Sequence, residues 1–409
     1  MTYDFDRHID RVGTDCVKYD AIYKQLERCD VKPLWIADMD FETPPFVIRA
    51  IENRLRQRVL GYTCPSEGFY KSIINWMQRR HGVSLESKDL HFVPGIVPAL
   101  HHAICALTEK GDKVLIQPPV YHPFAHIINI NERVEVDSPL RVADGRFEMD
   151  FDDLDRKLEG CKMMILCNPH NPGGTVWAPE VLGRLAALCK KHNVIVLSDE
   201  IHSDMTHSGH KYTPFVNVSD DARDISIALN APSKTFNMPG VVVSYCYSLS
   251  PTLRRRYFTF LERADVAIGN VFACDCLEAC YSDEGEQWLC QMLNYVTDNI
   301  RFVEDYLAAN CPKIRPMKVE ASFLMFLDHS EMPFATADEL QDFYLNKAGL
   351  YLNQGHSFGC TGEAFMRLNV ALPRAELTQA LDKLKAAYDD VGASSDIRKE
   401  ILPKGCMKM

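Results

Sequence analysis

Short apolar runs separated by helix-like stretches mark the middle of the chain. Four of these runs cover residues 114–116, 163–167, 194–198 and 225–229, and they contain few polar residues. Near-continuous apolar runs of this length are typical of parallel strands that are buried on both faces. Their alternation with helix-like stretches from Lys113 to Tyr247 predicts an α/β fold, with a mostly parallel central sheet and helices on both faces.

The pattern changes on either side of this region and predicts four segments. Residues 1–45 are turn-rich, and we expect them to join a small domain. Residues 46–285 form the large domain, which opens with helices at 46–58 and 68–80. Helices at 286–310, 337–347 and 374–388, with strands at 322–327 and 365–370, predict a smaller α+β domain over residues 286–395. Residues 396–409 are expected to be a flexible tail.

Composition narrows the class of protein. The chain has 409 residues and a net charge of −11, without a basic run of five or more residues. These values exclude a basic nucleic-acid or anionic-membrane surface. The 15 cysteines lack paired ligand spacing, which predicts buried hydrophobes in a reducing compartment and no metal site. A soluble cytoplasmic protein is expected, because the N-terminus has no apolar signal region and no stretch reaches about 18 apolar residues.

A polar or aromatic residue follows each of the four runs, namely Tyr121, Asn171, Asp199 and Lys234. In open α/β sheets, ligands bind outside the carboxyl ends of the strands. We therefore expect these four side chains to form one site.

Lys234 and Asp199 are the candidates for the central chemistry. Lys234 has uncharged neighbours, and partial desolvation would favour its neutral, nucleophilic amine. Asp199 directly follows a buried strand, where an unpaired carboxylate is costly. Opposite a pyridine nitrogen, this carboxylate would keep that nitrogen protonated. The plainer alternatives are a surface lysine in a turn and an aspartate that caps a helix.

Asn171 and Tyr121 offer further ligand contacts. Asn171 lies in a turn with two Asn-Pro pairs and two glycines, where it serves the turn and can also donate to a phenolate oxygen. Tyr121 can stack on a ring face or pack beneath a loop. An aromatic face, an amide, a carboxylate and a lysine together match the needs of a pyridoxal 5'-phosphate (PLP) enzyme.

Two segments are suited to bind anions. Gly95-Ile96-Val97, followed by Pro98, is a glycine turn at a helix N-terminus, which suits a phosphate. The chain has neither a GxGxxG motif nor a P-loop, which counts against a nucleotide ligand. Arg367 lies inside an apolar strand-like run, and a buried arginine requires an anion. That anion is either the α-carboxylate of an amino acid or the partner in an internal ion pair.

Taken together, the chain resembles the fold-type I PLP enzymes of the aspartate aminotransferase superfamily (class I/II aminotransferases). More narrowly, it is similar to the MalY/PatB class of cystathionine β-lyases and cysteine desulfhydrases. The resemblance covers nearly the whole chain and rests on eight blocks in order: Ile36–Phe41, Leu60–Thr63, Pro94–Ala99, Pro119–Phe124, Asn168–Gly174, Ser198–Asp204, Ala231–Asn237 and Arg367–Asn369.

The resemblance implies a role for each matching position. Lys234 resembles the Schiff-base lysine, and Asp199 the partner of the pyridine nitrogen. The remaining implied contacts are Asn171 near the phenolate oxygen, Tyr121 on the ring, His202 beside the coenzyme, Gly95, Ile96, Val97 and Ser233 at the phosphate, and Arg367, Asn171 and Ala37 at the substrate. Tyr62 matches a tyrosine lent across a dimer interface to the neighbour's phosphate, which implies a homodimer with a shared active site.

Two positions separate lyases from aminotransferases. Aminotransferases of this superfamily usually have tyrosine three residues after the aspartate, where this chain has His202 as in the lyase class. Many also have an arginine eight residues after the lysine, where this chain has Val242. His122 and the pair Met238-Pro239 depart from the usual lyase pattern, which bears on the shape of the pocket.

The resemblance implies a PLP-dependent carbon–sulfur β-lyase that releases a thiol, pyruvate and ammonia from a small sulfur amino acid. His202 either assists the leaving group or makes a structural hydrogen bond. The first alternative is an aminotransferase on the same fold. A second is a partner-binding protein that retains the fold without catalysis.

Overall fold

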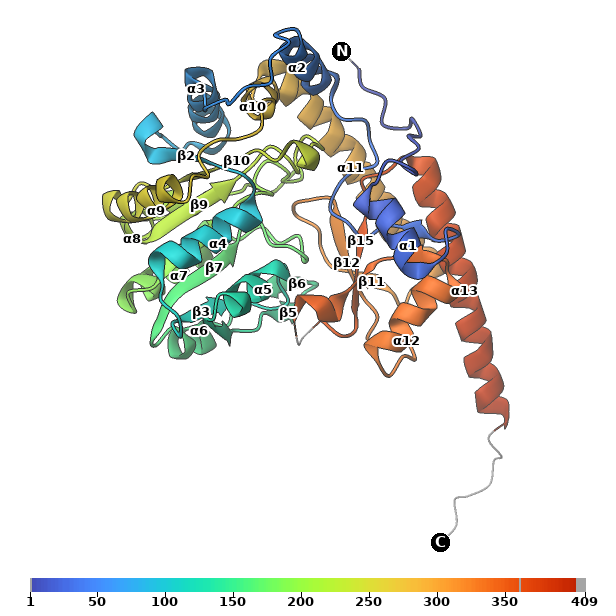
Figure 1. Ribbon diagram of the computed structural model, residues 1–409. Coiled ribbons are helices and arrows are strands. Elements are labelled where there is room, and N and C mark those ends of the chain that lie inside the picture. Colours follow the sequence, from blue (N-terminus) through green and yellow to red (C-terminus); the bar gives the residue numbers. More distant parts are fainter. Residues whose placement is uncertain (1, 360–361, 402–409) are drawn as a thin grey trace.

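The computed structural model describes residues 2–359 and 362–401, with side chains described to residue 391. Two halves lie side by side (Figure 1). The larger half is built from the middle of the chain around one sheet. The smaller half is built from the C-terminal third and the N-terminal segment.

A seven-stranded sheet forms the centre of the larger half, in the order β2-β10-β9-β8-β7-β3-β4. The strands β9, β8, β7, β3 and β4 are parallel, whereas β10 runs antiparallel to both of its neighbours. The predicted mostly parallel sheet is confirmed. The strands are β2 (Leu90–Val93), β3 (Lys113–Ile116), β4 (Val134–Asp137), β7 (Cys161–Cys167), β8 (Ile195–Asp199), β9 (Ser226–Asn230) and β10 (Ser244–Tyr247).

Successive residues of the central strands pack into different cores. In β7, Met163 and Ile165 belong to the core beneath α4, α5 and α9, whereas Met164 and Leu166 belong to the core beneath α6, α7 and α8. Because both faces are buried, these strands lack a polar side, which explains their continuous apolar runs. These helices are α4 (Ile96–Leu107), α5 (Pro123–Ile130), α6 (Phe151–Lys157), α7 (Pro179–Lys191), α8 (Asp220–Ile225) and α9 (Pro251–Arg263).

A third core joins the two halves. It contains residues of α2 (Pro45–Leu55), α3 (Glu67–Trp76), α10 (Ala273–Cys280) and α11 (Asp283–Asn310), together with strands of the smaller half. Ser282 caps α11 by accepting a hydrogen bond from the Gly285 N–H. The hairpin of β5 (Arg141–Ala143) and β6 (Arg146–Glu148) lies outside the central sheet.

The smaller half contains a four-stranded sheet in the order β11-β12-β15-β14. The N-terminal segment packs here, because β1 pairs in parallel with β13. The division of the chain at residues 45 and 285 stays a prediction. The remaining elements are α1 (Ile22–Leu26), β1 (Lys32–Pro33), β11 (Arg315–Pro316), β12 (Leu324–Asp328), α12 (Ala337–Asp342), β13 (Leu350–Tyr351), β14 (Asn353–Gln354), β15 (Phe365–Asn369) and α13 (Arg374–Ile401).

The last helix corrects one sequence-based expectation. The sequence predicted a helix that ends at Tyr388, but α13 continues to Ile401. The flexibility of the tail from residue 396 stays a prediction. Residues 392–401 contain no proline, so no residue there interrupts the backbone hydrogen bonds of the helix. Residues 402–409 lie outside the described part.

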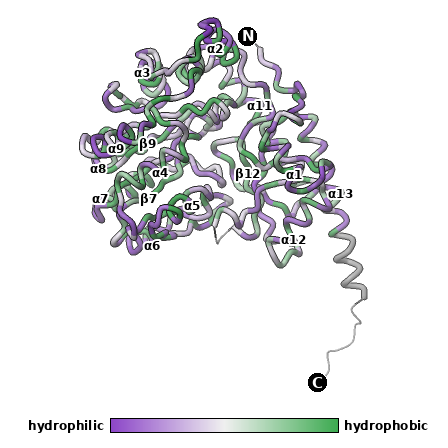
Figure 2. Tube along the Cα trace, in the orientation of Figure 1, coloured by the Kyte–Doolittle hydropathy of each residue, from purple (hydrophilic) through white to green (hydrophobic). Residues whose placement is uncertain are grey.

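Hydropathy follows the layers of the fold. Hydrophobic residues gather along the central strands, whereas α6, α7 and α8 carry many hydrophilic residues (Figure 2). Within the described residues, no helix combines the length and the apolar character needed to cross a membrane. The cytoplasmic location stays a prediction.

Candidate active site

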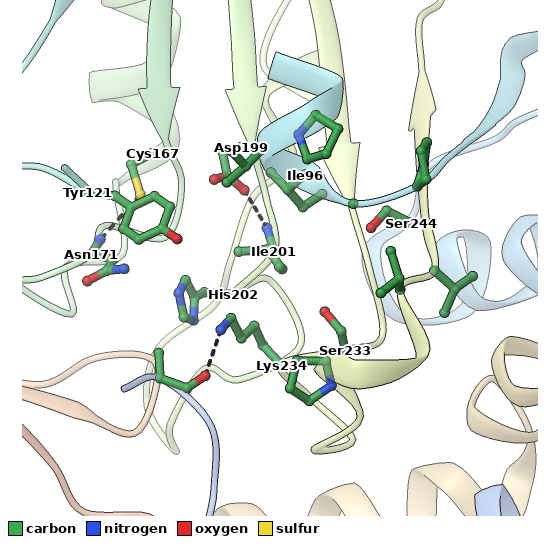
Figure 3. Close-up of a pocket in the computed structure, with 18 residues that line it drawn as sticks. Ile96, Tyr121, Cys167, Asn171, Asp199, Ile201, His202, Ser233, Lys234 and Ser244 are labelled. Atoms are coloured by element: carbon green, nitrogen blue, oxygen red, sulfur yellow. Dashed lines mark hydrogen bonds between the residues drawn. The ribbon is translucent and has the colours of Figure 1, made fainter. Parts of the chain in front are cut away.

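A cavity of about 330 Å³ opens at the carboxyl edge of the central sheet. Ten of the twelve residues predicted for the site line this cavity: Ala37, Gly95, Ile96, Val97, Tyr121, Asn171, Asp199, His202, Ser233 and Lys234. In the view of Figure 3, Tyr121, Asn171 and His202 lie on one side, whereas Ile96, Ser233 and Ser244 lie on the other. The cavity therefore has one end lined by aromatic and amide groups and one end lined by hydroxyls and a helix terminus.

Strand geometry explains why these residues meet. Asp199 is the last residue of β8, and it lies between Cys167 of β7 and Leu229 of β9 in the register of the sheet. Asn171 and Lys234 each follow a neighbouring strand by four residues. Parallel strands end at the same edge, so residues far apart in the sequence become neighbours there.

Lys234 points its amine into the cavity. Its Nζ donates a hydrogen bond of 2.6 Å to the Ala37 carbonyl oxygen, which belongs to the N-terminal segment (Figure 3). Burial, with a smaller contribution from the Arg367 charge, lowers the pKa of Lys234 to about 8, whereas Asp38 and Asp199 oppose the shift. The amine is therefore partly neutral near physiological pH, as a nucleophile or a base requires.

Asp199 is a buried carboxylate that accepts few hydrogen bonds. Among the described residues, its side chain accepts a hydrogen bond from the Ile201 N–H (3.2 Å) and from no other group. Burial raises the pKa of Asp199 to about 7, and the neighbouring Glu200 adds to the shift. A cationic N–H placed at this carboxylate would satisfy it and stabilise its ionised form.

His202 is neutral in this cavity. Burial lowers its pKa to about 3, and the Lys234 and Arg367 charges contribute. Its Nδ1 is buried, and no described residue hydrogen-bonds to that atom. The imidazole can therefore offer a ligand one donor and one acceptor, but it is a poor source of a proton.

The N-terminus of α4 forms the anion-binding end of the cavity. Gly95 has φ +112°, and a Cβ there would meet Pro98 at 3.3 Å, so the turn requires glycine. The free N–H groups of the first helical turn and the helix dipole favour an anion at this point. Among the described lining residues, Lys234 is the only one with a basic ammonium or guanidinium group, so backbone and hydroxyl donors must carry most of the binding of an anion here.

Arg367 of β15 is 3% exposed and does not itself line this cavity, but it contacts the lining residue Asn171. Its guanidinium donates to the Asn171 Oδ1 (3.0 Å), the Trp35 carbonyl oxygen (2.8 Å) and the Asn353 Oδ1 (2.6 Å). Its Nε has no partner, and burial lowers its pKa to about 10. No carboxylate of the described chain pairs with Arg367, so the predicted alternative of an internal ion pair is wrong.

Several lining residues were not anticipated from the sequence. Ser244 begins β10, and it reaches the site because β10 runs antiparallel to its neighbours, so that its N-terminal end lies at this edge. Cys167 and Ile201 line the cavity through their places beside Asp199. The apolar run after Ser244 could have indicated a strand that starts there. The direction of that strand in the sheet cannot be read from the local sequence.

Val242 also lines the cavity, with a left-handed φ of 55°. This backbone conformation is costly for a β-branched residue, on the order of 1–3 kcal/mol, and such strain concentrates at functional sites. The side chain is 45% exposed at the mouth of the cavity.

Three further residues discussed from the sequence do not line this cavity. Tyr62 is fully exposed. His122 lines a neighbouring cavity with Phe358, so it does not shape the main one. Met238 lines a second, larger cavity, which touches the first at Lys234 and Pro239.

Comparisons with known proteins identify the family and relatives of this chain. Residues 30–384 match the family model for class I and II aminotransferases. Cystathionine beta-lyase PatB from Bacillus subtilis is 41% identical over 385 residues, which cover 94% of this chain and 99% of PatB.

Two solved structures share the fold. A PLP-bound protein from Clostridium difficile, described as an aminotransferase, has a TM-score of 0.92 and 37% identity, covering 95% of this chain and 100% of that one. The PLP-bound C-S lyase from Staphylococcus hominis has a TM-score of 0.88 and 32% identity, covering 95% of this chain and 98% of that one.

Proposed function

The chain belongs to the class I and II aminotransferase family, and from that premise we propose that it is a PLP-dependent carbon–sulfur β-lyase. The reaction consumes an S-substituted cysteine and water and yields a thiol, pyruvate and ammonia. The single observation that carries amino-acid chemistry is the approach of a buried arginine without a carboxylate partner to a cavity that holds Lys234 and Asp199. The resemblance to PatB favours the lyase reaction.

The described residues fit the coenzyme. Asp199 makes no ion pair with a described residue and would hold a proton on the ring nitrogen, while Asn171 would donate to the phenolic oxygen. Tyr121 would cover the ring, and His202 would contact the coenzyme at the same end. The phosphate would take the N–H groups of α4 and the hydroxyls of Ser233 and Ser244, which line the same cavity. When bound, PLP supplies a carbonyl for an amine and a ring that withdraws electrons.

The chain's own groups handle the substrate. Arg367 would bind the α-carboxylate through its planar fork, which fixes the α-carbon against Lys234. The neutral Lys234 amine would remove the α-proton, since its pKa of about 8 keeps a neutral fraction available. The thiolate then departs from the β-carbon, and Lys234 carries a proton that it can return. His202, with a pKa of about 3, is unsuited to donate that proton.

An assay without an acceptor separates this function from the alternative. We expect the PLP-loaded protein to release a thiol and pyruvate in equal amounts from an S-alkyl cysteine. An aminotransferase would release neither product and would transfer the amino group only when a 2-oxo acid is added. The likeness to the C. difficile protein makes this second function the one to test against.

A homodimer with a shared site is the second part of the proposal. Exposed apolar side chains form a patch beside the cavity. Val97 (37% exposed) and Val242 (45%) line the cavity, and Val59 (73%), Leu60 (63%), Tyr62 (100%) and Ile268 (45%) lie in loops connected to Val242, because the Asn270 side-chain amide donates to the Val241 carbonyl oxygen. The loop that carries Tyr62 is held there by a bridge between Thr63 and Gly269. Val97 and Val242 also line the cavity, so a second copy seated on this patch would close it and could present its own Tyr62.

Complementation tests the shared site. Lys234→Ala removes the reacting amine, and Tyr62→Ala removes the hydroxyl that one subunit would lend to the other. If the site is shared, mixed and reassembled subunits of the two variants form one intact site in each mixed dimer. Activity above that of either variant alone supports the proposal. A monomer by light scattering, or no recovery on mixing, contradicts it.

A further inference from the structure

A second cavity of about 1010 Å³ adjoins the coenzyme cavity; we call it the outer cavity. It is lined by parts of residues 7–17, 36–43, 47–51 and 237–241, and it shares Lys234 and Pro239 with the coenzyme cavity. If PLP fills the first cavity and Arg367 takes the α-carboxylate, the outer cavity is the space next to the reacting amine that is left for the S-substituent. Its volume exceeds what a hydrogen or methyl group requires.

The deeper charges of the outer cavity already satisfy one another. Arg11 pairs with Asp38 (2.6 Å) and Asp40 (2.8 Å), and Lys18 pairs with Asp40 (2.9 Å). These four side chains are between 1% and 21% exposed. Opening such a network would leave a buried charge without a partner, which is strongly unfavourable. A ligand would therefore gain little by competing for these groups.

A different pair at the rim is open to a ligand. Arg7 and Glu42 lie 3.2 Å apart, and their side chains are 63% and 53% exposed. Neither side chain has another partner among the described residues. An exposed pair of this kind contributes little to stability, so it can separate easily. A ligand that carries both signs of charge would offer each member a replacement.

Between the rim and Lys234, the wall offers apolar surface. Met238, Val241 and Ile51 line this stretch, and they suit the methylene stem of a substituent. The remaining charged groups of the rim are engaged: His8 meets Glu376 at 2.6 Å, and the Asp10 carboxylate accepts the Val12 N–H at 3.0 Å.

We propose that Arg7 and Glu42 determine specificity for the far end of the S-substituent. Arg7 binds a carboxylate there and Glu42 binds an ammonium, so each residue selects for one charged group on the substituent. This inference rests on the proposed lyase function and assigns two residues outside the coenzyme cavity to substrate selection.

Four substrates test the assignment: cysteine carrying S-propyl, S-carboxyethyl, S-aminoethyl or S-(3-amino-3-carboxypropyl) groups. The variants are Arg7→Met, Glu42→Gln and, as a control, Arg49→Met, which opens the exposed Arg49–Glu284 pair outside the cavity. We expect Arg7→Met to lower kcat/KM about fivefold for the carboxyethyl substrate relative to the propyl one, through KM. Glu42→Gln should do the same for the aminoethyl substrate.

The doubly charged substrate should lose selectivity with either variant, and Arg49→Met should change no ratio. The same order should appear in the Kd values of the matching α-methyl amino acids, which lack the α-proton and bind without turnover. The assignment is overturned if Arg7→Met and Glu42→Gln shift all four substrates equally, or shift none. If the unaltered protein releases pyruvate from none of the four, the lyase function itself is wrong.

Discussion

Replacing Arg367 tests the mechanism at its most specific point. The guanidinium is 3% exposed and donates to two amide oxygens and a carbonyl, all neutral acceptors. The substrate carboxylate would be its first anionic partner. Truncating one member of a buried, hydrogen-bonded charge pair costs about 3–5 kcal/mol. At about 1.4 kcal/mol per factor of ten, Arg367→Met should lower kcat/KM roughly a hundred- to several-thousandfold.

The Arg367→Lys variant measures how much of this effect is geometry. Lysine keeps the positive charge but lacks the planar fork, so we expect a loss at the lower end of that range. Arg367 hydrogen-bonds one proposed coenzyme contact, Asn171, whereas Lys234, Asp199 and the α4 N-terminus have no hydrogen bond to it among the described residues. Both variants should therefore retain the visible absorbance of bound PLP, which separates a substrate defect from loss of the coenzyme.

The decisive assay compares an amino acid with its decarboxylated amine. Alanine and ethylamine share the reacting amine and differ in the carboxylate, and the change in coenzyme absorbance reports the binding of each. The unaltered protein should bind alanine more tightly, and Arg367→Met should remove most of that difference. Equal weakening of both ligands, or an unchanged kcat/KM, would refute the role given to Arg367.

Asp199 and Lys234, the ionisable groups of the cavity, lead to further predictions. Asp199→Asn should lower kcat on the order of a hundred- to a thousandfold, because the amide cannot hold a proton on the ring nitrogen. The coenzyme-free variant should be no less stable to urea than the unaltered protein. Burial raises the pKa of the Asp199 carboxyl to about 7, which shows that its charge is costly to bury, and the amide carries no charge. The rate of PLP uptake by the coenzyme-free protein should rise with pH through about 8, where Lys234 loses its proton. That folded-state pKa lies below the ordinary value of about 10.4, so between about pH 8 and 10.4 the unfolded protein binds more protons than the folded protein. The free energy of unfolding should therefore rise with pH between these two values. A flat uptake rate between pH 7 and about 9 would contradict this assignment of the amine.

The amino-acid sequence by itself determined the sheet and the end of the sheet where chemistry gathers. Strands buried on both faces must be apolar throughout, so β7, β8 and β9 are visible as runs of apolar residues. A polar residue directly after such a run is costly unless a ligand or partner satisfies it, which marked Asp199. Lys234 and Asn171 could be placed in the same site because they follow neighbouring parallel strands, which end at the same edge of the sheet.

Only the tertiary structure decided what no local pattern encodes. Ser244 reaches the cavity because β10 runs against its neighbours, and strand direction is set by contacts between distant segments. Arg367 had two possible partners in the sequence, and the packing of the two halves showed that no described carboxylate meets it. The outer cavity likewise arises where the N-terminal segment folds over Lys234. Local patterns report which residues are buried, whereas the partners of a buried group depend on how separate elements pack.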